Sequence, residues 1–213
     1  MSALEREPAP PTTAVAAEQA LCTHVADSLS GLEVEALGRA RRIADLGSGA
    51  GFPGLVLAIA LPAAQVDLVE SQTRKTSVSD RLLQAARLGN ARSVTTRAED
   101  WAKSPPPLGG RESYEAVTAR ALAPLAVLAE YASPLLAGGG VLVAWKGARD
   151  HEEEAAAEAA APALSMEPRE VRRVRPFEGA ERRHLHVLRK AGATPPGLPR
   201  RVGMARKRPF RGG

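Results

Sequence analysis

A glycine-rich turn at residues 43–54 constrains the fold of this chain more than any other segment. It reads IADLGSGAGFPG: an apolar run containing Asp45, glycines at alternate positions, and then an apolar stretch with helical spacing. Glycine adopts backbone angles that other residues avoid, and its missing side chain lets a ligand approach the backbone. A strand, a glycine turn and a helix in this order typically present bare backbone to a nucleotide-like cofactor.

Strand and helix patterns alternate after this turn, which predicts an α/β fold with a mostly parallel twisted sheet and helices on both faces. A helix at 151–161 is followed by two alternating segments, 170–175 and 184–190, which predict an antiparallel end to the sheet. The predicted parallel strands are 43–46, 66–70, 94–96, 114–118 and 141–145, and the predicted helices between them are 53–60, 74–88 and 124–136.

The length of 213 residues suits one domain with a real hydrophobic core. We expect a disordered, proline-rich N-terminus at 1–13 and a helical segment at 14–40. The predicted cofactor-binding domain then covers 41–192, and a basic tail covers 193–213.

Several classes of protein are disfavoured by composition. No apolar run approaches the roughly 18 residues that a membrane span needs, and the N-terminus lacks the apolar core of a signal peptide. Cys22 is the single cysteine, and the histidines show no HxxxH spacing. We therefore expect a cytoplasmic protein with no membrane association, no disulfide framework and no metal site.

The tail at 199–213, PRRVGMARKRPFRGG, is rich in Lys and Arg and contains no acid. Such a segment favours contact with phosphates, although a solvated, frayed terminus is the alternative. Aromatic residues make up only 3% of the chain, so a platform for stacking single-stranded bases is poorly supplied. The pattern favours recognition of a nucleic acid through its backbone or shape.

The identity of the cofactor depends on the residues around the glycines. Gly49, Gly51 and Gly54 formally satisfy the GxGxxG fingerprint of dinucleotide-binding oxidoreductases. Asp45 stands two residues before the first glycine, however, and Pro53 inside the motif predicts that the helix begins there. The segment from Asp45 to Gly51 resembles the first motif of class I methyltransferases, which bind S-adenosylmethionine.

Acidic residues follow the next two predicted strands. Glu70 ends the second strand, where a carboxylate can accept hydrogen bonds from both ribose hydroxyls of such a cofactor. Ala98 and Glu99 follow the third strand, where folds of this kind contact the adenine. A solvated acid at a strand end is the alternative for each carboxylate.

A wider set of segments resembles, in order and spacing, the bacterial RsmG (GidB) family of 16S ribosomal RNA guanine-N7 methyltransferases. The resemblance covers about residue 24 to the C-terminus, and it predicts the Rossmann-like class I methyltransferase fold. The segments are GSGAGFPG from Gly47, LGNARSVTTRAE from Leu88, TARA from Thr118, KG from Lys146 and ERRHL from Glu181.

This resemblance implies that S-adenosylmethionine is the cofactor and that 16S ribosomal RNA or the small ribosomal subunit is the partner of a chain acting as a monomer. Arg120 follows the fourth predicted strand, so we expect it to bind the methionine carboxylate or an RNA phosphate, with a plain surface salt bridge as the alternative. Lys146 ends the fifth strand and by the same geometry would face the substrate guanosine, with a merely snorkelling side chain as the alternative. Gly47, Phe52, Ala98, Glu99 and Arg120 correspond to cofactor contacts of the family, and our own interpretation of the motif adds Gly49 and Glu70.

Guanine N7 has an in-plane lone pair and no proton to lose, so methylation there requires alignment rather than a base. We therefore name no catalytic residue, and we expect Asp45 and Glu99 to act as binding groups. Few residues precede the family-like segment at His24. A weakly active or non-catalytic RNA-binding paralogue is therefore the first alternative, and an NAD(P)-binding oxidoreductase the second.

Overall fold

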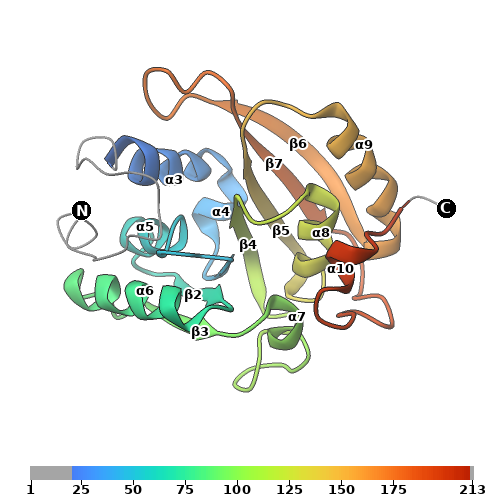
Figure 1. Ribbon diagram of the computed structural model, residues 1–213, viewed down its shortest axis with the longest axis horizontal. Coiled ribbons are helices and arrows are strands. Elements are labelled where there is room, and N and C mark those ends of the chain that lie inside the picture. Colours follow the sequence, from blue (N-terminus) through green and yellow to red (C-terminus); the bar gives the residue numbers. More distant parts are fainter. Residues whose placement is uncertain (1–20, 212–213) are drawn as a thin grey trace.

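A seven-stranded sheet with the order β3-β2-β1-β4-β5-β7-β6 forms the centre of the molecule (Figure 1). The computed structural model describes residues 21–211 of the chain. The strands are β1 (Arg42–Leu46), β2 (Gln65–Glu70), β3 (Ala91–Thr95), β4 (Tyr114–Arg120), β5 (Leu136–Lys146), β6 (Met166–Val174) and β7 (Arg183–Lys190).

The first five strands pair in parallel, and β7 pairs antiparallel with both β5 and β6. Strand order reverses between β1 and β4, because the chain leaves β1 toward β2 and later returns to β4 on the other side. In open α/β sheets, ligands bind outside the carboxyl ends of the strands at such a switch point. The predicted mostly parallel sheet with an antiparallel end is confirmed.

Helices connect the strands and cover both faces of the sheet (Figure 1). The α-helices are α3 (Asp27–Leu29), α4 (Glu35–Arg39), α5 (Gly54–Ala60), α6 (Thr73–Ala85), α7 (Ala98–Trp101), α8 (Leu125–Ala132), α9 (His151–Ala160) and α10 (Met204–Lys207). Shorter turns of other helix types are η1 (Leu21–Ala26), η2 (Ser30–Glu33) and η3 (Pro162–Leu164).

Two hydrophobic cores lie on opposite faces of the sheet, because side chains alternate along each strand. On β1, Ala44 and Leu46 belong to the core that includes α8 and α9, whereas Ile43 belongs to the core that includes α5 and α6. Each of these side chains is at most 1% exposed. Burial on both faces explains why β1 has a nearly continuous apolar sequence.

The predicted elements are all present, with different ends. Strand β3 begins at Ala91, earlier than predicted, because it is an edge strand whose exposed Arg92 pairs with Asp67 of β2. Strand β5 begins at Leu136, and its register with β4 shifts by a bulge before Val141. Helix α8 is correspondingly shorter than the predicted segment 124–136.

The predicted disordered segment 1–13 lies outside the described residues, as does the start of the predicted helical segment 14–40. From residue 21 to Arg39 the chain is a series of short helical turns. After Lys190 the chain packs on the sheet's α8 face, where Leu198 and Ala205 are buried. The division into domains stays a prediction. Among the described residues, no helix is long and apolar enough to cross a membrane.

Candidate functional site

The glycine turn follows β1 and has the backbone conformation that its sequence predicts. Gly47, Gly49 and Gly51 all have positive φ angles, of 63°, 59° and 98°. The Gly47 amide donates a hydrogen bond of 2.8 Å to the carbonyl oxygen of Val69 in β2. A Cβ atom on Gly47 would lie 2.5 Å from Leu122 Cδ1, so a side chain at this position requires Leu122 to move. The turn thus presents bare backbone at the carboxyl edge of the sheet.

The buried side chain of Asp45 is hydrogen-bonded to the end of this turn. Its side chain is fully buried, and its two oxygens accept hydrogen bonds from the Gly54 amide at 3.0 Å and the Thr118 hydroxyl at 2.8 Å. Burial raises the pKa of Asp45 to about 7, although these two hydrogen bonds and the charge of Arg120 oppose the rise. Asp45 therefore joins β1 to β4 and to the start of α5, rather than facing a ligand as we expected of a binding group.

Glu70 is the last residue of β2, and its carboxylate is hydrogen-bonded to the turn. One carboxylate oxygen accepts a hydrogen bond from the Gly49 amide at 3.3 Å, and the other accepts one from the Gln72 amide at 2.9 Å. The residue is largely buried, yet it lines a cleft beside Gly47. A carboxylate held in this way is pre-oriented at the cleft wall.

This cleft brings together four of the seven predicted cofactor-binding residues, from segments that follow β1, β2 and β3. The residues that line it are Gly47, Val69, Glu70, Ser71, Thr96, Arg97, Ala98, Glu99, Leu122, Tyr131 and Arg206. Gly49, Phe52 and Arg120 do not line it. Sequence reasoning therefore found the part of the wall formed by strand ends, and it missed the part formed by Leu122, Tyr131 and Arg206.

A second cluster surrounds Arg120, at the end of β4. Its guanidinium lies 3.1 Å from the Asp27 carboxylate, 3.1 Å from His24 Nδ1 and 5.9 Å from the centre of the Phe52 ring. The His24 ring stacks on Phe52 with centroids 4.8 Å apart. Burial and the positive charge of Arg120 lower the pKa of His24, so this imidazole is neutral near pH 7. Arg120 thus belongs to a largely buried ion pair, in which its side chain is 16% exposed and that of Asp27 is 2% exposed, rather than to a solvated surface pair.

Asp27 connects three segments that are distant in the sequence. Besides Arg120, its carboxylate faces Arg183 of β7 at 3.7 Å, and its carbonyl oxygen accepts a hydrogen bond from Trp145 of β5 at 2.8 Å. The sequence motifs around His24, Thr118 and Glu181 therefore meet at one carboxylate. All three motifs can be recognised in the sequence, but no spacing signal relates them to one another.

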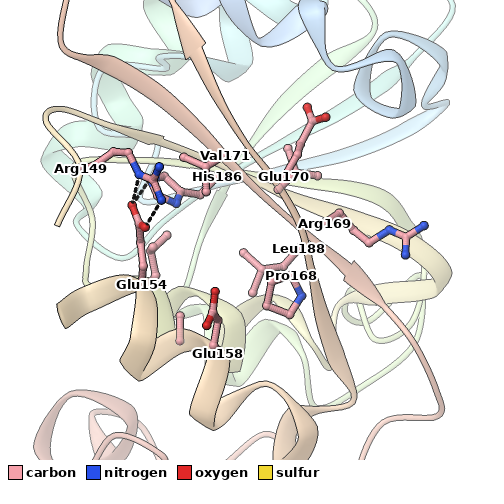
Figure 2. A pocket seen from close by; sticks show the side chains of 12 residues that line it. Arg149, Glu154, Glu158, Pro168, Arg169, Glu170, Val171, His186 and Leu188 are labelled. Carbon is pink, nitrogen blue, oxygen red and sulfur yellow. Dashed lines mark hydrogen bonds and ion pairs between the residues drawn. The ribbon is translucent and has the colours of Figure 1, made fainter. Parts of the chain in front are cut away.

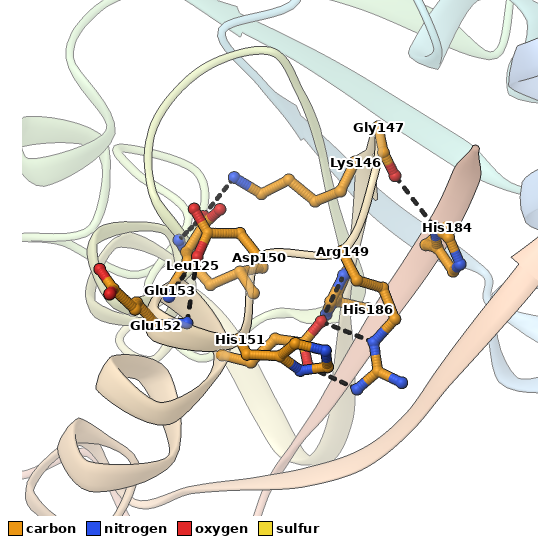
Figure 3. Close-up of polar contacts among 11 residues, drawn as sticks. Leu125, Lys146, Gly147, Arg149, Asp150, His151, Glu152, Glu153, His184 and His186 are labelled. Carbon is orange, nitrogen blue, oxygen red and sulfur yellow. Dashed lines mark hydrogen bonds and ion pairs between the residues drawn. The ribbon is translucent and has the colours of Figure 1, made fainter.

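Lys146, which ends β5, is held by protein groups (Figure 3). Its ammonium donates to the Ala123 carbonyl at 3.1 Å and pairs with the Glu153 carboxylate, which also accepts the Leu125 amide at 2.6 Å. Lys146 therefore secures the loop between β4 and α8, which contains Leu122. The expected contact with a guanosine stays a prediction.

A separate hollow lies between α9 and strands β6 and β7 (Figure 2). Two of its charged side chains, Arg149 and Glu154, form an ion pair, and Glu154 lies 3.8 Å from His186. Burial lowers the pKa of His186. The hollow shares no residue with the cleft beside the glycine turn, so it does not extend that site.

The residues of the cleft fit S-adenosylmethionine. The turn at Gly47 presents backbone without a side chain beside the cleft, Glu70 supplies a fixed acceptor, and Arg120 lies next to Phe52 of the turn. No His, Cys, Asp and Glu side chains between residues 21 and 211 form a group that could hold a metal ion.

The sheet order, the glycine turn and the acid that ends β2 define a class I S-adenosylmethionine-dependent methyltransferase. Solved structures agree. A predicted O-methyltransferase of Agrobacterium tumefaciens superimposes with a TM-score of 0.59 at 25% identity, over 78% of this chain and 81% of that chain. Geranyl diphosphate C-methyltransferase of Streptomyces coelicolor, 14% identical, gives 0.58 over 76% of this chain and 78% of its own, and shows the shared fold.

The chain belongs to the rRNA small subunit methyltransferase G (GidB) family, whose sequence model matches residues 12–185. Proteins named ribosomal RNA small subunit methyltransferase G are similar over most of their length. That of Desulfitobacterium hafniense is 37% identical over 91% of this chain and 78% of the relative. That of Pelotomaculum thermopropionicum is 39% identical over 97% and 86%, and that of Rubrobacter xylanophilus is 41% identical over 92% and 75%.

These findings confirm the predicted family, fold, cofactor and enzyme class, ribosomal RNA methyltransferase. They set aside the oxidoreductase alternative, because the GxGxxG match lies within a methyltransferase motif. The individual cofactor-binding residues stay predictions, since the comparisons do not assign them.

Proposed function

We propose that this protein transfers a methyl group from S-adenosylmethionine to N7 of a guanine in 16S ribosomal RNA. Membership of the small-subunit rRNA methyltransferase G family supports the RNA and the reaction class. The structural observation that carries the proposal is the cleft itself. Gly47, Glu70 and the pair Ala98 and Glu99 follow three different strands, and they line one space at the carboxyl edge of the sheet.

In this proposal, each part of the cofactor has a matching part of the site. The turn gives backbone contact, Glu70 accepts from the ribose hydroxyls, and the Ala98 amide and Glu99 carboxylate face the adenine. The proposed cofactor-binding residues are Gly47, Gly49, Phe52, Glu70, Ala98, Glu99 and Arg120.

Arg120 is proposed to bind the methionine carboxylate. A guanidinium suits this task because it pairs with carboxylates through two parallel hydrogen bonds. The contacts with Asp27 and Phe52 hold the guanidinium beside the glycine turn before any ligand arrives. A side chain that is already oriented loses less conformational entropy when the ligand binds.

The proposed chemistry requires positioning rather than proton transfer. S-adenosylmethionine supplies an electrophilic methyl group, and guanine N7 offers a lone pair without a proton to remove. The residues of the site hold the two reactants in line, and such orientation is worth roughly 7–11 kcal/mol. Nearby carbonyls and carboxylates stabilise the cationic guanine that results. No general base is assigned.

The partner in this proposal is 16S ribosomal RNA, free or within the small subunit. A substrate in the ribosome supports a cytoplasmic location, and we propose that the enzyme acts there as a monomer. Light scattering of the purified protein tests the monomer. The first alternative, a ribosome-associated protein without catalysis, predicts RNA binding that is indifferent to S-adenosylmethionine.

Methyl transfer to small-subunit RNA by a Gly47→Arg variant tests the proposal. The new side chain would fill the turn and meet Leu122, so transfer is expected to fall below detection. The matched control is Gly89→Arg, because a Cβ there has nothing within 4 Å, and it is expected to keep wild-type transfer. Unchanged transfer by a folded Gly47→Arg protein would contradict the proposed site.

A further inference from the structure

The basic C-terminal segment, residues 198–211, lies against the cofactor cleft rather than away from the protein. Helix α10 lies beside α8 (Figure 1). Arg206 of α10 lines the cleft together with Glu99 and Leu122, and its guanidinium donates a hydrogen bond of 2.8 Å to the Leu122 carbonyl. The expectation of a phosphate-binding or frayed tail does not account for these contacts.

Glu99 is held directly by this segment. Its carboxylate is 6% exposed and accepts a hydrogen bond of 2.8 Å from the Gly203 amide, 104 residues later in the chain. Gly203 has a φ angle of 78°, a conformation that favours glycine. The sequence therefore has glycine at the position whose backbone amide orients the Glu99 carboxylate.

Residues 198–211 are held against α8 by an ion pair and by buried apolar side chains. Arg200 makes two hydrogen bonds with the buried Glu130 carboxylate of α8, one of 2.6 Å, and its guanidinium lies 4.2 Å from the centre of the Phe210 ring. Leu198 and Ala205 are buried in the core beneath. A paired buried carboxylate resists separation, because an unpaired one is costly.

Arg206 also supports the opposite side of the cleft. Leu122, whose carbonyl it contacts, is the residue that packs over Gly47. Tyr131 lines the same space, where burial and then the charge of Glu99 raise its pKa, while a hydrogen bond with Arg206 opposes the rise. The Arg206 guanidinium, together with Glu99 and Tyr131, thus gives the cleft a polar lining.

We propose that residues 198–211 form one wall of the adenosine end of the cofactor pocket. In this wall Gly203 positions the Glu99 carboxylate, and Arg206 contacts the cofactor and holds Leu122. The inference rests on the proposed cofactor-binding role of Ala98 and Glu99. It gives a segment with the composition of an RNA-binding tail a second task, performed by the Gly203 amide and the Arg206 guanidinium, which contact Glu99 and Leu122.

Binding of S-adenosylhomocysteine, measured by calorimetry, tests this proposal. Arg206→Ala is expected to weaken binding about tenfold, or about 1.4 kcal/mol. The matched control is Lys207→Ala, which removes the same charge from the neighbouring residue, also exposed but not part of the cleft lining, and is expected to change affinity less than twofold. Equal affinities for Arg206→Ala and wild type would overturn the proposal, as would equal losses in both variants.

Two further variants separate pocket formation from mere stability. Gly203→Ala adds a methyl group with nothing within 4 Å, so it strains only the backbone that places the amide. Gly203→Ala is expected to weaken S-adenosylhomocysteine binding several-fold in the wild-type protein. The same substitution is expected to have a smaller effect on binding in a protein that already carries Glu99→Gln. Arg206→Lys is expected to recover part of the affinity lost in Arg206→Ala. Additive effects of Gly203→Ala and Glu99→Gln would contradict the positioning role.

Failure of this inference differs from failure of the proposed function. If the wild-type protein itself does not bind S-adenosylhomocysteine, both fail. If it binds and methylates RNA while the Arg206 and Gly203 variants bind equally well, only the C-terminal wall is contradicted. The melting temperatures of the ligand-free variants show that each binding result comes from folded protein.

Discussion

Gly47 combines two independent constraints in one residue. Its φ angle of 63° favours glycine, and a Cβ at this position would meet Leu122 at 2.5 Å. The backbone constraint costs any other residue roughly 1–2 kcal/mol, and the contact with Leu122 adds to it. A different position of the Leu122 side chain relieves the contact, but it leaves the backbone strain and changes a residue that lines the cleft.

Gly47→Ala is therefore expected to weaken S-adenosylhomocysteine binding at least tenfold and to lower the free energy of unfolding by about 1 kcal/mol or more. Calorimetry and urea unfolding measure the two effects. Gly89→Ala is the control, since a Cβ there meets nothing within 4 Å and its φ is not positive. Wild-type affinity in Gly47→Ala would show that the turn does not contact the cofactor.

Asp45 gives a pH-dependent contribution to stability. Its pKa is about 7 in the folded protein against 3.8 in the unfolded chain, so the folded state keeps its proton over this range. Stability is then fully present below pH 3.8 and falls as the pH rises toward 7, with a slope of up to about 1.4 kcal/mol per pH unit.

Asp45→Asn removes this titration and keeps an acceptor for Gly54. We expect the difference in unfolding free energy, wild type minus variant, to decrease steadily between pH 4 and pH 7. Urea unfolding at several pH values measures it, and the subtraction cancels the titration of His24 and His186. A difference that does not change with pH would contradict a buried Asp45 with a raised pKa.

Residues at strand ends could be predicted from the sequence, and residues brought in by later segments could not. Glu70 and Glu99 follow strands whose carboxyl ends share one edge, so a strand prediction alone places them. Asp27 pairs with Arg120, and Arg206 donates a hydrogen bond to Leu122; in each case the two partners are far apart in the sequence. Nothing in the local pattern around either residue specifies such a partner.

Among the elements, α8 connects the core to the C-terminal segment. Its Glu130 is 4% exposed and is paired with Arg200, whose neighbour Arg201 is exposed. Removing one partner of such a pair leaves a buried charge without compensation, which costs about 3–5 kcal/mol.

Arg200→Ala is expected to lower the free energy of unfolding by about 3 kcal/mol, whereas Arg201→Ala is expected to change it by less than about 0.5 kcal/mol. Chemical denaturation of both variants makes the comparison. Equal stability of the two variants would show that the C-terminal segment is not anchored on α8.

Helix α9 begins with a local cap that the sequence contains. Asp150 accepts hydrogen bonds of 3.0 Å from the amides of Glu152 and Glu153 (Figure 3). Asp150→Ala is expected to lower the unfolding free energy by about 1 kcal/mol, measured in urea, because these amides lose their partner. The exposed Glu158→Ala on the same helix is the control, and an equal effect of both substitutions would contradict the cap.

Hydrophobic periodicity predicts which helices and strands are present, but it does not predict the residues at which they begin and end. The strands β1 and β4 are apolar because both of their faces are buried, so their positions were predictable. The start of β5 contains three consecutive glycines and a register shift, which carry no strand signal. Its pairing with β4 depends on tertiary structure.

For the whole molecule, the sheet order places every strand end that forms the site at one edge. The glycine turn, Glu70 and the segment at Ala98 line one wall of the cleft, and the loop after β4 and the C-terminal segment line the other. The proposed function needs no general base from this arrangement. In that proposal, the chain holds the two reactants in line.

The most direct test of the account is a map of N7-methylguanosine in small-subunit ribosomal RNA from cells with and without this protein. We predict that one modified guanine is present in the first map and absent from the second, and that it returns with the wild-type chain but not with Gly47→Arg. Identical maps from the two kinds of cell would contradict the proposed activity.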